Sequence, residues 1–74
     1  MKLSEMTAGQ RGRIRDLRGK ERFLGRITSV GITVGCPVVV MQNRRKMPVL
    51  VHARDSAIAL DRADCELIDV EVAL

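Results

Sequence analysis

The side chains that could bind a metal or act as nucleophiles are few in this chain. It has one histidine, His52, and two cysteines, Cys36 and Cys65. A transition-metal ion is usually held by several converging groups, for example two histidines and a carboxylate. His52 and Cys36 are therefore the candidate metal ligands, but a single histidine predicts that the chain alone holds neither a metal ion nor another cofactor. A metal site shared between two chains stays open.

These residues do not form a recognisable catalytic motif. A cysteine–histidine pair needs a third, orienting group and a pocket around it. Two glycines, Gly31 and Gly35, precede a strand-like run, whereas a phosphate-binding loop precedes a helix and carries a lysine. We therefore expect no enzyme and no catalytic residues, and any nucleotide chemistry would belong to a partner.

The distribution of cysteines and apolar residues favours a cytoplasmic protein that does not insert into a membrane. The two cysteines form no Cys-x-x-Cys pair, which favours free thiols in a reducing compartment. The beginning of the chain lacks the apolar run and cleavage site of a secretory signal. The longest apolar segment, from Cys36 to Met41, is far shorter than the roughly 20 residues that span a bilayer.

The length and charge of the chain limit both its organisation and its partners. With 74 residues, 46% of them hydrophobic and 30% charged, it should form one globular domain over residues 1–74. Residues 1–54 hold 12 Lys or Arg and 3 Asp or Glu, whereas residues 55–74 hold 1 and 6. The resulting charges of +9 and −5 could attract an acidic protein surface, phosphate or an anionic membrane surface. The alternative is that the arginines are simply the solvated face of the strands.

The segment between two turns near residues 19 and 31 has the apolar period of a helix. Its apolar residues recur at i, i+1, i+4 and i+7, which places them on one face. These are Phe23, Leu24, Ile27 and Val30. Gly31 follows where the end of a helix favours positive φ, which glycine adopts without steric cost.

The other segments read as strands. Residues 10–17 alternate, with Ile14 directed inward and three arginines outward, and β-branched runs follow at 36–42 and 47–53. The loop 43–46 suits a hairpin, a turn at Arg54-Asp55 leads to a strand over 56–60, and a last strand covers 67–72. Asp61 is expected to cap one helical turn over 62–65 through its side chain. Five short strands with one helical insertion between the first and second predict a mainly β fold, a small closed SH3-like β-barrel.

Several segments together resemble the family of ferrous iron transport protein A, FeoA, over nearly the whole chain. The most specific is the Gly-Ile-Thr-x-Gly corner, followed at fixed distances by Pro-Val-x-Val and Ile-Ala-Leu. The matching segments are Leu3-Ser4-Glu5-Met6, Gly9-Gln10, Val30-Gly31-Ile32-Thr33-Val34-Gly35, Val38-Val39-Val40, Pro48-Val49-Leu50-Val51 and Ile58-Ala59-Leu60. The resemblance implies a cytosolic SH3-like domain that assists the membrane ferrous-iron transporter FeoB, which carries a cytosolic GTP-binding domain. The same domain occurs at the C-terminus of iron-dependent repressors.

A partner-binding surface is expected on the helix. An apolar contact ringed by arginines is a composition that protein interfaces favour. The candidate residues are Arg22, Phe23, Leu24, Arg26 and Ile27. An alternative is that Phe23, Leu24 and Ile27 simply cover one end of the barrel. Whether the domain associates weakly with itself stays open.

Two other functions remain as alternatives. The basic loop Asn43-Arg44-Arg45-Lys46 could track nucleic-acid phosphates. Phe23 is the only aromatic residue, so the stacking platforms of a single-strand binder are missing. Recognition of a duplex through its backbone stays open as the alternative, although no nucleic acid is expected. A metal-responsive interaction domain like that of the iron repressors would use His52, Cys36 or an acidic residue across a dimer. Recognition of proline-rich peptides fails because such grooves are lined by aromatic side chains.

Overall fold

The chain folds into one antiparallel sheet of five strands. The computed structural model describes residues 1–73. Its elements, in chain order, are the 3-10 helix η1 (Leu3–Glu5), β1 (Arg11–Leu17), α1 (Glu21–Ser29), β2 (Pro37–Gln42), β3 (Val49–Ala53), β4 (Ser56–Leu60), α2 (Arg62–Cys65) and β5 (Ile68–Val72). The predicted mainly β fold with five strands and a helix between the first two is confirmed.

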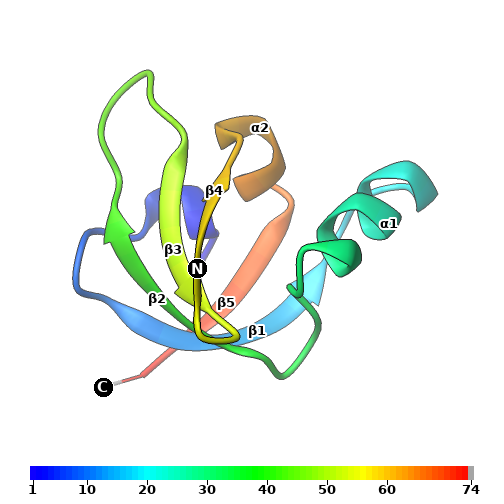
Figure 1. Ribbon diagram of the computed structural model, residues 1–74, viewed down its shortest axis with the longest axis horizontal. Coiled ribbons are helices and arrows are strands. Elements are labelled where there is room, and N and C mark those ends of the chain that lie inside the picture. The colour runs from blue at the N-terminus through cyan, green and yellow to red at the C-terminus, as the bar shows by residue number, and fades with distance from the viewer. Residues whose placement is uncertain (74) are drawn as a thin grey trace.

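The strands follow the order β4-β3-β2-β1-β5, and every neighbouring pair is antiparallel. The sheet curls around its inner face, as Figure 1 shows. Within residues 1–73 no ladder joins β4 to β5, so the barrel is open between its two edge strands rather than closed by hydrogen bonds. The outer edge of β5 is partly covered by the N-terminal residues. Val70 N donates to Met1 O at 2.7 Å, and the backbones of Lys2 and Asp69 form an isolated antiparallel β-bridge.

The inward residues of the strands and both helices form one apolar core. On β3, for example, Val49 and Val51 are fully buried, while His52 between Val51 and Ala53 is exposed. The largest fully buried side chains are Leu3, Met6, Ile14, Ile27, Ile32, Ile68, Val38, Val40, Val49, Val51, Val70 and Cys65. In the part of the chain that the structure describes, no helix has the length and apolar character that a membrane crossing requires.

The two helices lie on the side of the molecule between the sheet edges. The link α2 connects β4 to β5, and α1 is joined to it by Arg26 Nη2, which donates to Asp64 Oδ1 at 2.7 Å. Only Phe23 and Ile27 of α1 are buried, so the helix contacts the core along a narrow stripe and projects away from the sheet (Figure 1).

Three local expectations were wrong. Val30 is 43% exposed, because it is the C-cap of α1, where the backbone (φ −89°, ψ 0°) has left the helix and turned its side chain off the apolar face. Asp61 stands at the N-cap of α2, but its side chain accepts no capping hydrogen bond, since the amides of this exposed single turn can be hydrated instead. The strand expected from residue 47 begins at Val49, because Lys46 (φ 63°) and the bond from Met47 N to Arg44 O extend the loop.

Candidate interaction surfaces

The glycine corner after α1 fixes the direction in which the helix leaves the sheet. Gly31 has φ 99°; its amide donates to Thr28 O at 3.0 Å and the amide of Ile32 donates to Ile27 O at 3.2 Å. These two bonds form a Schellman motif, which ends a helix with a left-handed residue and an apolar contact. Ile32 and Ile27 supply that contact, since both are buried in the core. The predicted glycine C-cap is therefore confirmed.

Two arginines from distant elements hold this corner in place. Arg13 of β1 donates from Nη1 to Gly35 O at 3.1 Å. Arg54, in the turn between β3 and β4, donates to Gly31 O at 3.2 Å and to Thr33 Oγ1 at 2.8 Å. Both Arg54 and Asp55 have positive φ, as a two-residue hairpin turn of this type requires. The corner and α1 are thereby tied to both halves of the sheet.

The structure divides the helix residues that we expected to bind a partner into two groups. Phe23 and Ile27 are buried, at 6% and 1% exposure, so they anchor α1 to the core. Leu24 is half-buried, and Arg22 and Arg26 are exposed. The accessible part of the predicted surface is therefore one edge of Leu24 and the exposed side chains of Arg22 and Arg26.

A hollow beside α1 extends this surface. We call it the basic hollow; its volume is about 450 Å³ and it is lined by Arg18, Gly19, Lys20, Arg22, Phe23, Arg26 and Leu67. The ring of Phe23 forms part of its wall, with Arg26 Cζ 6.0 Å from the ring centre. A Cβ on Gly19 would lie 2.0 Å from the Phe23 ring, so only glycine lets the backbone pass the ring this closely. Apart from Arg22, Phe23 and Arg26, these residues were not part of the predicted helix surface.

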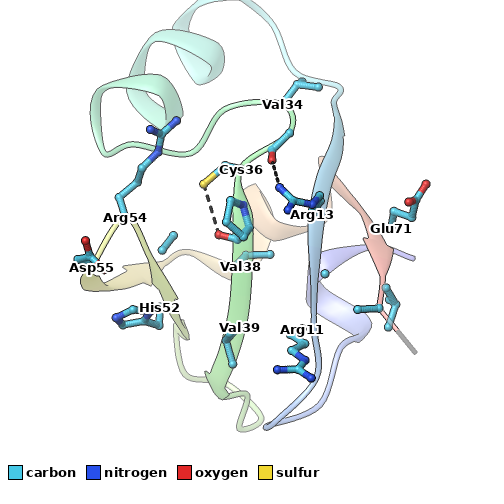
Figure 2. Close-up of a pocket in the computed structure, with 16 residues that line it drawn as sticks. Arg11, Arg13, Val34, Cys36, Val38, Val39, His52, Arg54, Asp55 and Glu71 are labelled. Atoms are coloured by element: carbon cyan, nitrogen blue, oxygen red, sulfur yellow. Dashed lines mark hydrogen bonds between the residues drawn. The ribbon is translucent and has the colours of Figure 1, made fainter.

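A second, larger depression lies on the outer face of the sheet beneath the glycine corner (Figure 2). We call it the outer groove; its volume is about 900 Å³. Its floor contains the cross-strand row Arg11–Val39–His52, because Arg11 and His52 are both paired with Val39. The sequence did not predict this groove, although alternation along each strand places Arg11 and Arg13 on the outer face of β1 and His52 on the outer face of β3.

The two candidate metal ligands do not come together. Cys36 is 3% exposed, follows the inward parity of Val38 and Val40, and its Sγ lies 3.4 Å from Pro37 O. His52 lies on the opposite, outer face of the sheet and is exposed. Among residues 1–73, no three histidine, cysteine, aspartate or glutamate side chains gather as a metal site would require.

Burial also makes the second cysteine unreactive. Cys65 is fully buried, and burial, with the nearby Asp64 carboxylate as a smaller cause, raises the pKa of its thiol to about 12. A thiol with such a pKa carries almost no thiolate at neutral pH, and the thiolate is the nucleophile and the metal ligand. Both cysteines are free thiols, and the structure gives them packing roles.

Comparison with known proteins adds to this geometry. The family model described as FeoA domain matches residues 1–72. No curated protein matches the chain in sequence. A crystal structure of an iron uptake regulatory protein, FeoA, is similar at 20% identity with a TM-score of 0.95, covering 99% of this chain and 97% of that one.

Two further structures extend the comparison. Iron(II) transport protein A from Clostridium thermocellum is 26% identical with a TM-score of 0.90, covering 97% of this chain and 45% of that one, so this chain spans less than half of its length. The Stenotrophomonas maltophilia FeoA complexed with zinc, called a prokaryotic SH3 domain protein, is 18% identical with a TM-score of 0.81, covering 96% and 89%. These similarities confirm the predicted SH3-like fold.

Proposed function

Because the chain belongs to the FeoA domain family, we propose that it is a small, single-domain, cytoplasmic accessory protein of bacterial ferrous iron uptake. In this proposal it binds the cytosolic GTP-binding domain of the membrane transporter FeoB and modulates it. The protein acts by contact alone and performs no chemistry of its own.

The observation that carries the proposal is the shape and composition of α1. Leu24 is half-buried on α1. Arg22 and Lys20, which line the basic hollow beside the same helix, have no carboxylate partner among residues 1–73. Binding hot spots usually combine an apolar centre, which loses its water on contact, with arginines around it. Positively charged side chains that have no carboxylate partner would also increase the rate of association with an acidic partner surface.

The way in which α1 is mounted supports the same proposal. Phe23 and Ile27 bury one stripe, the Schellman motif fixes the end, and Arg26 bonds Asp64 of α2. The helix is thus presented to a partner in one orientation, which reduces the ordering that binding requires.

The proposal is tested by replacing Leu24→Glu in the native gene and measuring ferrous iron uptake that depends on the transporter. A glutamate at this position brings a charge into the apolar centre of the proposed contact, so uptake should fall to the level of a strain without the protein. Val30→Glu is the matched control, because Val30 is an apolar residue that is 43% exposed at the C-cap of α1 and is not part of the proposed contact; it should leave uptake unchanged.

The fold of each purified variant is checked by its amide NMR spectrum. If Leu24→Glu unfolds the domain, Leu24 is a core residue and the double variant Lys20→Glu/Arg22→Glu decides instead. Normal uptake with a folded Leu24→Glu domain, or with that folded double variant, would refute α1 as the contact surface.

A further inference from the structure

The outer groove carries an inference that is independent of α1. It runs over the outward residues of β1, β2 and β3, and the glycine corner forms one wall, with Val34 at the top (Figure 2). It is twice as large as the basic hollow, at about 900 Å³ against about 450 Å³. The proposed function does not use it.

The arginines of this groove differ from Arg15, Arg18 and Arg26, which are paired with carboxylates. Arg15 and Arg18 lie 3.4 and 3.8 Å from the carboxylate of Asp69, and Arg26 bonds Asp64. By contrast, Arg11, Arg13 and Arg54 have no carboxylate within 4.0 Å among residues 1–73. Their positive charge is therefore available to a ligand.

Two of these arginines are already held in place. Arg13 bonds Gly35 O with one nitrogen, and Arg54 bonds Gly31 O and Thr33 Oγ1 with two. A guanidinium has five N–H donors, so each keeps donors for a carboxylate. Because carbonyl and hydroxyl oxygens already order these side chains, little conformational entropy is lost when a ligand binds.

Apolar surface lies directly between these charges. Val39 is 37% exposed and is flanked in its cross-strand row by Arg11 and His52, while Val34 is 63% exposed at the wall. Outward side chains two residues apart on a strand lie on the same face, so Arg11 and Arg13 can contact neighbouring groups of one bound segment. The groove thus offers a cationic side next to an apolar floor.

The acidic residues of the groove stand at its margins. Glu71 is paired with Arg13 across β5 and β1, yet its carboxylate points away from the floor in Figure 2, and Asp55 lies at the opposite margin. A nucleic acid, which is negative at every phosphate, would meet both carboxylates. It would also find no stacking platform, because the only aromatic residue, Phe23, is 6% exposed in the core and does not line the groove.

We propose that the outer groove is a second docking site, which binds an extended acidic segment of a partner protein. A carboxylate of the segment contacts Arg11 and Arg13, and a neighbouring apolar side chain packs on Val39 beneath Val34. The acids at the margins restrict the acidic residues to the middle of the segment. Charge complementarity and the adjacent apolar floor together favour this occupant over a phosphate backbone.

The test uses the full chain labelled with ¹⁵N and a synthetic nonapeptide, acetylated and amidated, with glutamate-leucine-glutamate at its centre and serine and glycine elsewhere. Amide shifts should concentrate on the outer residues of β1, β2 and β3. A peptide with glutamine in place of both glutamates should bind at least tenfold more weakly. Leu24→Glu should leave binding of the first peptide unchanged, which separates this site from α1.

Variants then locate the charges. Arg11→Gln/Arg13→Gln should weaken binding at least tenfold, whereas Arg45→Gln/Lys46→Gln, with the same loss of charge in the β2–β3 loop, should change it less than twofold. Val39→Asp keeps all three arginines and should also abolish binding of the peptide. If the loss of Arg13 unfolds the glycine corner, this variant tests the groove instead. Equal binding of the neutral peptide, shifts centred on α1, no shifts at millimolar peptide, or groove shifts caused by a DNA oligonucleotide instead would each overturn the proposal.

Discussion

The substitution Gly25→Ala tests whether α1 is a cooperative part of the fold. Gly25 lies in the middle of the helix, is exposed, and a Cβ built on it meets no atom within 4 Å. Glycine inside a helix is less favourable than alanine by about 1 kcal/mol, mainly through backbone entropy. The variant should therefore be more stable by about 1 kcal/mol, which raises the melting temperature of a domain of this size by about 4–8 °C.

The assay is urea unfolding followed by far-UV circular dichroism, with the slope m compared between variants. Gly12→Ala is the matched control on β1, where the added Cβ would lie 2.2 Å from the backbone oxygen of Glu71. The backbone of β1 or β5 would have to move, so this variant should lose about 3 kcal/mol. An unchanged or lower midpoint for Gly25→Ala would refute the reasoning, because it would mean that residues 21–29 do not unfold together with the sheet.

Two further predictions concern titratable groups. A hydrogen bond from the Met1 amino group, with Arg15 and Arg18 nearby, holds the pKa of Asp69 below its ordinary value of 3.8, so the domain should lose stability as the pH falls below that value. In urea unfolding, the Asp69→Asn variant should lose less free energy of unfolding than the wild type between neutral pH and about pH 3. An identical loss in both proteins would contradict this. Burial raises the pKa of the Cys65 thiol to about 12, so in a Cys36→Ser variant this thiol should not react with a disulfide reagent at about pH 8 until urea unfolds the chain, and reaction at the rate of an unfolded peptide would contradict its burial.

Local patterns predicted most of the elements. Alternation gave β1 with Ile14 inward, the β-branched runs gave β2 and β3, and the position of Gly31 gave the end of α1. Each of these depends on residues only a few positions apart. The errors are local too: Val30 has already left helical geometry at the C-cap, and the Asp61 side chain makes no capping hydrogen bond.

Contacts between distant residues could not be predicted in the same way. Arg13 and Gly35 are 22 positions apart, and Arg54 and Gly31 are 23 apart, so nothing local links them. The basic hollow depends on Gly19 packing against Phe23 and on Leu67 from the far end of the chain. The helix surface was predicted from the residues of α1 alone. Only the fold shows which of these residues are buried as anchors and which are accessible.

The most direct measurement of the central proposal is isothermal titration calorimetry of this chain with the purified cytosolic GTP-binding domain of the transporter from the same organism. We predict saturable binding of one chain per domain, equal affinity for Val30→Glu, and at least tenfold weaker binding, or about 1.4 kcal/mol, for Leu24→Glu. Absence of binding by the folded wild-type chain, or equal affinity of folded Leu24→Glu, would contradict a role in which α1 contacts the transporter.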